Sequence, residues 1–573
     1  MEKPLQSIFD VDMAAKIWTR EGAWVCAAIV PMVGMLLYEL ALNAESCDGH
    51  FTYPLDDAYI HLAMAKNWVA NGVIGLNGTE YIALSSSPLY TGLVALLVWV
   101  FGLSEYHMLA INILCAVGLV VSSFRLLGVL GIGSWVSAGM VAAVFLISPA
   151  HIIVLGGMEH VLQCWLVVGF AACLGNLFQS EAATKSKQIG LAFKLSLWAF
   201  LAVACRLECL FLVLPCAVYC FWSGPRWLVV AFASAALLPL LAYGYWNIQS
   251  GNYFFPNSIM LKSQAEMQPW EVGNWYLYSV QKLSLLMKDE VYKFAIPAFI
   301  FLPPLLAKMA DMAVLKLEAE RYRFLSMLLA AHFFALLAHG FLGQLGSSHR
   351  YDHYLQFLSL LMICSLFAFV FSWLWTQKPR VEYLLRFGIW LLPLSLLVWV
   401  SLTTLEYRFG ASWRLATKGA RNIYLHQKQA ARFFNDYYPS EPLVVNDVGV
   451  VGAYTQSQLL DLSGISSPSV LAYILAETWS PANFATVWRA GGRPRVGFVY
   501  PHVWRPVIDS SWHACGMLRL DSRENCASDT IAFFAYTDAD AAYLRQSLGT
   551  FAPTMPKGAH IEMLADRYAL LHK

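Results

Sequence analysis

Two adjacent carboxylates, Asp56 and Asp57, follow the first long hydrophobic run of the chain. A positioned carboxylate can take the proton of a hydroxyl group, so the pair could supply a general base for group transfer. The structural alternative is the N-cap of a helix that begins at Ala58, because an Asp side chain accepts hydrogen bonds from the free N–H groups of a first turn. Capping accounts for Asp57 but not for a second acid beside it, so both roles stay open.

Further charged and polar residues interrupt or border apolar runs. Such groups are costly in lipid and are usually paired or functional. They are Arg206 and Glu208 within one apolar stretch, Glu159 and His160 at the start of another, and Lys262, His349 and Arg350 in loops that precede others. Basic side chains that converge on one outer face would suit a phosphate leaving group. Taken singly, each is more often a topological anchor or a structural ion pair.

The composition is that of a membrane protein. Of the 573 residues, 58% are hydrophobic and only 13% are charged, whereas a soluble protein has roughly 25% charged residues. The mean hydropathy is +0.54, and the net charge of +1 gives no indication of nucleic-acid binding. Apolar runs cover residues 22–42, 88–103, 107–128, 134–153, 159–178, 190–205, 207–222, 226–246, 291–311, 324–342, 353–375 and 384–403. The first is long enough to span a bilayer, so we expect an anchor rather than a cleaved signal peptide.

The distribution of Lys and Arg orients these runs. The loop 43–87 holds one basic residue, Lys66, among several acidic ones, so we expect this loop outside and the N-terminus in the cytoplasm. Apolar residues at helical spacing over 58–71 predict an interfacial helix lying on the membrane. Basic loops alternate with outer loops and place everything after Leu405 outside. Twelve runs would return the chain to the cytoplasm, so eleven or thirteen crossings are required, and the discrepancy falls in 88–155.

Residues 406–573 have a different character. Buried-strand patterns at 443–447, 459–462, 496–500 and 531–536 alternate with helical patterns at 422–438 and 538–548. This alternation predicts a small α/β domain. The expected fold is therefore a mostly α polytopic membrane protein, with about 11–13 transmembrane helices in residues 1–405 and a soluble domain in 406–573. Cys515 and Cys526 of this outer domain are a disulfide candidate.

Several short motifs carry a family resemblance. The segment Asp-Asp-Ala-Tyr-Ile-His-Leu-Ala-Met-Ala-Lys-Asn at 56–67, the turn Leu76-Asn-Gly78 and Ser86-Ser-Pro-Leu89 resemble the first outer loop of bacterial GT-C glycosyltransferases, which use polyprenyl-phosphate sugars. The arabinofuranosyltransferase and mannosyltransferase branch is the most similar. The resemblance continues through Gly157-Met-Glu159, Arg206-Leu-Glu208, Pro256-Asn257 with Lys262, His349-Arg350-Tyr351, and residues 446–454 and 460–464. Two details depart from it: Arg206 is followed by Leu instead of Pro, and 349–353 lacks a Gly-Arg-Tyr…Pro pattern.

The resemblance implies an assignment of roles. Asp56 would be the general base that activates an acceptor hydroxyl, with Asp57 supporting it or capping the helix. The donor phosphate would be bound by Arg206, Lys262, His349 and Arg350. Substrate contacts would come from Glu159, His160, Glu208, Asn257, Asp447 and Asp461, of which the last two end strands and could instead be caps. A divalent cation, Mg²⁺ or Mn²⁺, would be held by Asp56 and Asp57 if the enzyme uses one.

The implied partners are a polyprenyl-phosphate sugar donor, a glycan, lipid or protein acceptor, and the bilayer. The implied location is the bacterial inner membrane, with the active site and the C-terminal domain extracytoplasmic. The rival interpretations are a transporter or flippase of lipid-linked sugars, a polysaccharide polymerase or ligase, and a structural membrane protein. The sequence has no internal repeat, and its acidic pair lies outside the apolar runs, which favours an enzyme over a transporter.

Overall fold

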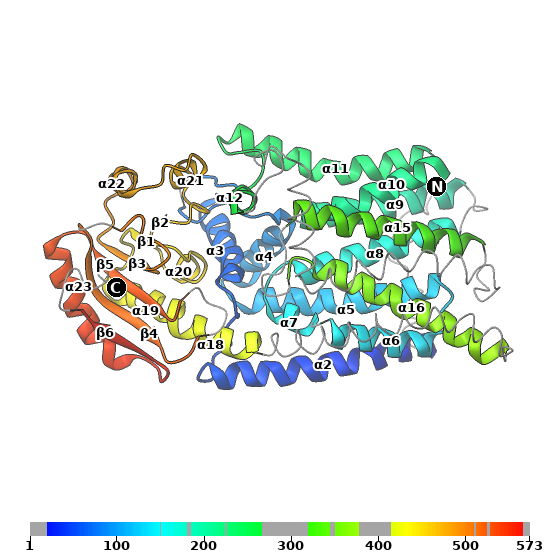
Figure 1. The fold of residues 1–573 in the computed structure, drawn as a ribbon, viewed down its shortest axis with the longest axis horizontal. Helices are drawn as coiled ribbons and strands as arrows, with labels where there is room; N and C mark the ends of the chain where they lie inside the picture. Colours follow the sequence, from blue (N-terminus) through cyan, green and yellow to red (C-terminus); the bar gives the residue numbers. More distant parts are fainter. Residues whose placement is uncertain are drawn as a thin grey trace, which may run out of the picture.

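The computed structural model describes residues 20–78, 80–148, 150–179, 185–223, 226–265, 319–343, 350–377, 414–508, 511–523 and 528–564. In Figure 1 an elongated bundle of helices occupies one end of the molecule, and a domain built on a β-sheet occupies the other. Helices α3 (Asp56–Asn71) and α4 (Pro88–Phe101) lie where the two parts meet.

The bundle consists of apolar helices of different lengths. Besides α4 these are α2 (Arg20–Ser46), α5 (Tyr106–Val129), α6 (Ser134–Ile147), α7 (Ala150–Leu155), α8 (His160–Phe178), α9 (Lys185–Cys205), α10 (Leu210–Ser223), α11 (Arg226–Gln249), α15 (Ala319–Leu342) and α16 (His353–Gln377). Six of the described helices are long and apolar enough to cross a membrane. Helix α8 is the most enclosed, with 83% of its apolar window buried against 22% for α2. Helix α8 therefore forms the centre of the bundle, and α2 forms part of its rim.

The difficulty that the sequence raised in 88–155 has a structural counterpart. The apolar run 134–153 is divided between α6 and the six-residue α7. Helices α4 and α6 each have 14 residues, which is about 21 Å and too short to cross a hydrocarbon core of about 30 Å upright. The predicted runs 291–311 and 384–403 lie outside the described residues, so the number of crossings stays a prediction.

The helix expected over 58–71 is α3, and it begins two residues earlier, at Asp56. It ends at Gly72, whose φ of 72° is the left-handed conformation that commonly terminates a helix. The expectation that it lies on the membrane surface needs refinement. Helix α3 is covered by the bundle on one side and by the C-terminal domain on the other, and half of its residues are buried.

The C-terminal domain contains a mixed six-stranded sheet in the order β2-β1-β3-β5-β4-β6. Its strands are β1 (Leu443–Val445), β2 (Leu459–Asp461), β3 (Val496–Val499), β4 (His513–Leu520), β5 (Thr530–Ala535) and β6 (Ala559–Met563). Strand β1 pairs in parallel with β2 and β3, and the remaining pairs are antiparallel. The four predicted strands are all present, while β4 and β6 were not predicted.

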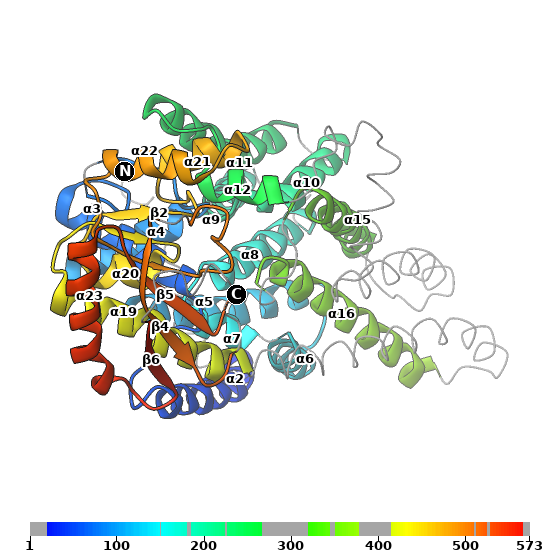
Figure 2. The same ribbon diagram turned by 60° about the vertical axis from the view of Figure 1, so that its left-hand side comes forward.

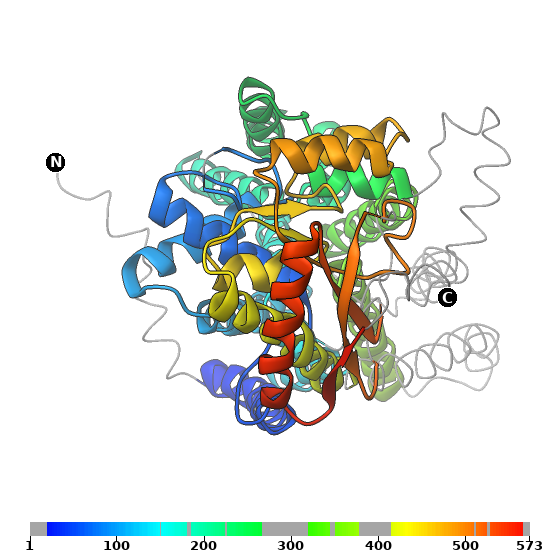
Figure 3. The same cartoon turned by 90° about the vertical axis from the view of Figure 1, so that its left-hand side faces the viewer.

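Helices flank this sheet. They are α18 (Ala420–Ile423), α19 (Gln429–Tyr437), α20 (Gly449–Tyr454), α21 (Pro468–Leu475), α22 (Pro481–Ala490) and α23 (Asp538–Phe551), with π-helical turns η2 (Leu415–Gly419) and η3 (Tyr424–Lys428) and the short turn η4 (Ala552–Thr554). Figure 3 looks onto the domain with α23 foremost and the bundle behind it. Figure 2 shows α21 close to α12 (Asn257–Ala265), a contact between the domain and the end of the bundle.

Candidate active site

The adjacent carboxylates of α3 have different partners. The two oxygens of Asp56 accept hydrogen bonds from the backbone N–H groups of Gly449 (2.7 Å) and Val450 (2.8 Å), at the start of α20. The residue before α3, Leu55, provides no side-chain cap, and Asp57 lies inside the first turn. The predicted N-cap role of Asp57 is therefore wrong, because the helix begins before it; instead, Asp56 accepts hydrogen bonds from the first N–H groups of a helix of the C-terminal domain.

The electrostatic surroundings make Asp56 a stronger base than an ordinary Asp. Burial and the nearby carboxylate of Asp447 raise the pKa of Asp56 to about 8, and the two N–H groups from α20 offset only part of this rise. Burial also raises the pKa of Asp447, which accepts a hydrogen bond from Gln427 Nε2 at 2.7 Å. Asp447 follows β1 closely, at the carboxyl edge of the parallel strands, where α/β sheets commonly place functional groups.

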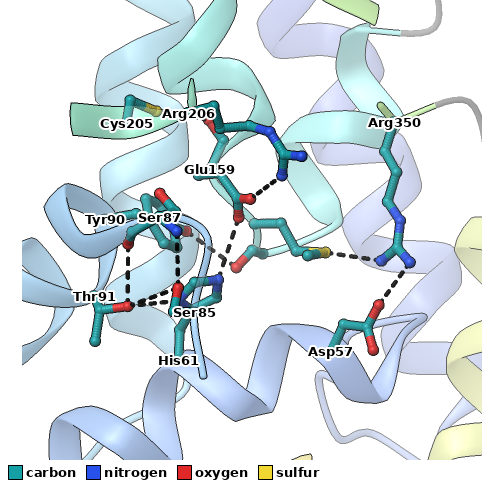
Figure 4. A network of polar contacts seen from close by, with 12 residues as sticks. Asp57, His61, Ser85, Ser87, Tyr90, Thr91, Glu159, Cys205, Arg206 and Arg350 are labelled. Atoms are coloured by element: carbon teal, nitrogen blue, oxygen red, sulfur yellow. Dashed lines mark hydrogen bonds and ion pairs between the residues drawn. The ribbon is translucent and has the colours of Figure 1, made fainter. Parts of the chain in front are cut away.

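Asp57 faces the bundle instead. Its Oδ2 lies 2.6 Å from Arg350 Nη2, and its side chain is 43% exposed while that of Arg350 is 8% exposed. Arg350 also donates to Met158 Sδ at 3.0 Å and lies over the ring of Tyr351. Figure 4 shows the guanidinium extending toward α3 from the start of the α16 region. A buried arginine is thus held at the edge of the membrane bundle by a carboxylate that solvent can reach.

A second polar network lies beside this pair (Figure 4). His61, one turn after Asp57 on α3, contacts Thr91 Oγ1 through Nδ1 (2.9 Å) and Glu159 Oε2 through Nε2 (3.2 Å). Glu159 Oε1 is 2.5 Å from Arg206 Nη1. Glu159 is buried and contacts both His61 and Arg206. Glu159 is therefore a structural centre that joins α3, α8 and the α9–α10 connection.

Arg206 and Glu208 form the structural ion pair that the sequence allowed as an alternative. Their side chains are 2.5 Å apart, and Glu208 lies in the short turn η1 (Leu207–Cys209). Arg206 is 4% exposed and already pairs with both Glu208 and Glu159. Two carboxylates compensate its single charge, so Arg350 is the better placed of the two arginines for a phosphate.

A small pocket opens beside Arg350. Its lining includes Leu55, Ile152, Ile153, Met158, His160 and Arg350. His160 is buried, and neither ring nitrogen has a hydrogen-bond partner among the described residues. Its ring stands edge-on to Tyr351, with centroids 5.6 Å apart. The pocket thus combines apolar walls with one cation and one imidazole.

The remaining predicted site residues are distributed as follows. Asn257 donates to the carbonyl of Ile465 (3.0 Å) and so connects α12 with the domain. Asp461 is buried, and Ser463 and Ser466 donate to it through both backbone and side chain, which makes it the centre of a turn. Lys262 falls within α12, where its side chain is not described, and His349 lies outside the described residues. The roles predicted for these four stay predictions.

A divalent cation would have to share Asp56 and Asp57 with other partners, so its binding there stays a prediction. Both oxygens of Asp56 accept backbone N–H groups, and a guanidinium lies against Asp57. No group of three metal-ligating side chains converges within the described part of the chain. Cys515 is buried on β4, whereas Cys526 lies outside the described residues, so the disulfide stays a prediction.

Residues that the sequence analysis did not select join α3 to the domain. Lys66 Nζ donates to the carbonyls of Gly452 and Thr455, both at 2.6 Å. Glu105 accepts hydrogen bonds from the hydroxyls of Tyr59 and Tyr454, and Lys428 lies 2.9 Å from it. Lys66 had a signal in the sequence, because it is the one basic residue in the loop 43–87. No sequence pattern pointed to Glu105, because its partners come from three distant segments.

Comparisons with known proteins agree with this architecture. A family described as Domain of unknown function (DUF8728) matches residues 420–534. No curated protein matches the chain at a significant level.

Three solved structures illustrate the structural similarity. The apo oligosaccharyltransferase of Archaeoglobus fulgidus is 11% identical, with 91% of this chain and 75% of that chain covered and a TM-score of 0.50. ArnT from Cupriavidus metallidurans bound to undecaprenyl phosphate is 12% identical over 90% of this chain and 99% of that one, with a TM-score of 0.47. AglB of A. fulgidus, in complex with an inhibitory peptide and a dolichol-phosphate, is 9% identical over 92% and 75%, with a TM-score of 0.46. The chain has the GT-C fold that its motifs predicted.

Proposed function

We propose that this multi-pass membrane protein is a glycosyltransferase that moves a sugar from a polyprenyl-phosphate donor to a hydroxyl of a glycan, lipid or protein acceptor. The observation that carries the proposal is the placement of Asp56 and Asp57. One carboxylate is oriented by the domain and has a raised pKa, and its neighbour meets a buried arginine at an apolar pocket. A fold shared with an oligosaccharyltransferase is supporting analogy only.

Asp56 is the general base in this mechanism. A carboxylate has about four lone-pair positions, and the two N–H groups of α20 use two of them. The acceptor hydroxyl gives its proton to Asp56 while its oxygen forms a bond to the anomeric carbon. The bond from that carbon to the phosphate oxygen breaks, and its electron pair leaves with polyprenyl phosphate. A pKa of about 8 brings Asp56 close to the pH at which it must work, which makes proton transfer efficient.

Arg350 binds the donor phosphate. A guanidinium presents paired N–H donors that match phosphate oxygens, and it cannot lose its charge at neutral pH. The carboxylate of Asp57 lies 2.6 Å from this group. The phosphate replaces Asp57 there, and Arg350 stabilises the charge that develops on the leaving group. The apolar wall around Met158 and Ile152 receives the first part of the isoprenoid chain.

The C-terminal domain binds the acceptor, because its parallel strands end beside Asp56 at Asp447. Under this proposal the site and residues 406–573 lie on the extracytoplasmic side of a bacterial inner membrane, and the N-terminus is cytoplasmic. The positive charges in the predicted cytoplasmic loops support this orientation.

The test is sugar transfer in membranes that contain the protein, with a panel of radiolabelled polyprenyl-phosphate sugars. We expect the wild type to release polyprenyl phosphate and label an acceptor with one donor. Asp56→Asn should lose at least about 100-fold in kcat, since it removes the base. Asp436→Asn, an exposed acid on α19, is the matched control and should retain full activity. No transfer from any donor by the wild type, or full transfer by Asp56→Asn, would contradict the proposal.

A further inference from the structure

Helix α20 of the C-terminal domain is held at both ends by side chains of α3. Asp56, the first residue of α3, accepts hydrogen bonds from the N–H groups at the N-terminus of α20. Lys66, in the third turn of α3, donates to the carbonyls of Gly452 and Thr455 at the other end. The Asp56 carboxylate lies at the positive end of the helix dipole and the Lys66 ammonium group lies at the negative end, so both contacts are electrostatically favourable.

The two helices approach so closely that α20 needs glycine on the contacting face. A Cβ atom on Gly449 would lie 2.0 Å from the backbone oxygen of Asp56 and 2.8 Å from its Oδ2. A Cβ atom on Gly452, one turn later, would lie 3.3 Å from the Cβ of Ala63. This packing fixes the distance between α20 and α3, and the hydrogen bonds at the two ends fix the position of α20 along α3.

Lys66 lies where burial disfavours its charged form. Its side chain is half-buried, and burial lowers its pKa to about 8. Both of its described hydrogen bonds go to carbonyls of the C-terminal domain, and Lys66 does not line the pocket beside Arg350. Its chemical effect is therefore exerted through α20 and not by contact with the pocket.

We propose that Lys66 is a positioning residue, which locks α20 onto α3 so that the domain's backbone N–H groups and Asp447 are held against the catalytic carboxylate of Asp56. The inference rests on the proposed function for its catalytic consequence. The soluble domain is then a fixed part of the active site as well as a surface for the acceptor. Asp56 has two tasks, since it anchors the domain and acts as the base.

The variants that test this are Lys66→Met and Lys66→Arg, with Lys557→Met as a control on an exposed lysine of the C-terminal domain. Lys66→Met keeps the length and apolar character of the side chain but loses both hydrogen bonds. We expect its kcat to fall about tenfold while the KM for the donor changes little, because Arg350 is untouched. Lys66→Arg should restore most of the activity.

The pH profile provides a readout that a loss of folded protein would not change. When α20 loosens, Asp56 loses burial, which is the main cause of its raised pKa. The acid limb of kcat should therefore move to lower pH in Lys66→Met and return in Lys66→Arg. A wild-type kcat and pH profile in Lys66→Met would overturn the proposal.

A measurement without substrate separates this inference from the proposed function. Hydrogen exchange of the Gly449 and Val450 amides should be slow in the wild-type protein and at least tenfold faster in Lys66→Met, while amides of the β3–β5 pair stay protected. This result is expected even if the wild type transfers no sugar. In that case Lys66 still holds α20 on α3, but its proposed catalytic role is wrong. Unchanged exchange at Gly449 and Val450 would overturn the proposal that Lys66 holds α20 on α3.

Discussion

The two faces of α3 contact different parts of the molecule. One face carries Asp56, Tyr59, Ala63 and Lys66 and packs on the C-terminal domain. The other carries Asp57 and His61, which contact Arg350 and Glu159 at the top of the bundle. Neighbouring residues on a helix point about 100° apart, so two adjacent carboxylates serve two different neighbours. In the proposed function, the pair therefore divides the reaction between an acceptor side and a donor side.

The largest effect is expected on the donor side. Arg350→Ala removes the charge that stabilises the leaving phosphate, and we expect kcat/KM to fall about 100- to 1000-fold. Arg350→Lys keeps the charge but loses the paired donors, so it should recover only part of this loss. Transfer kinetics measure the effect, and thermal unfolding of each variant checks that the bundle has folded. Activity near the wild-type level in Arg350→Ala would show that Arg350 does not bind the donor phosphate beside this face of α3.

A smaller effect of opposite character is expected for Asp57→Asn. This change removes the carboxylate that competes with the phosphate for Arg350. The KM for the donor should fall about threefold, and kcat should change less than tenfold, since Asp57 is not the base in the proposed mechanism. Titration of donor concentration at saturating acceptor measures both constants. A higher KM would show that Asp57 assists donor binding instead of opposing it.

The smallest effect is expected for Asp447→Asn on the domain side. The Asp447 carboxylate helps to raise the pKa of Asp56, so its neutralisation should lower that pKa. A general base must be deprotonated to act, and a lower pKa therefore shifts the acid limb of kcat to lower pH. The plateau at high pH should fall about threefold, because a weaker base accepts a proton less readily. An acid limb that moves to higher pH would contradict this electrostatic coupling.

The sequence predicted what local patterning can encode. The apolar runs gave most bundle helices, and the continuous apolar segments gave β1, β2, β3 and β5. Strands β4 and β6 were not predicted because polar residues such as Arg519 and Glu562 interrupt them, and β6 is an edge strand. The importance of the loop 43–87 was also predictable, from its acidic pair and its motifs.

The partners of those acids were not predictable. Asp56 and Gly449 are 393 residues apart in the chain, and no periodicity connects them. The sequence could offer capping as one role for an Asp, but only the fold shows that the capped helix belongs to another domain. Likewise Arg206 and Arg350 look equivalent in sequence. Their difference lies in the two carboxylates that already surround Arg206.

The most direct test of this division is the single-turnover transfer rate of Asp56→Asn beside that of Asp57→Asn, with donor saturating and the same acceptor. We expect a loss of at least about 100-fold for Asp56→Asn and less than tenfold for Asp57→Asn, because only the former removes the base. The reverse order would contradict it, since the base would then lie on the bundle-facing side of α3 and Asp56 would only anchor the domain.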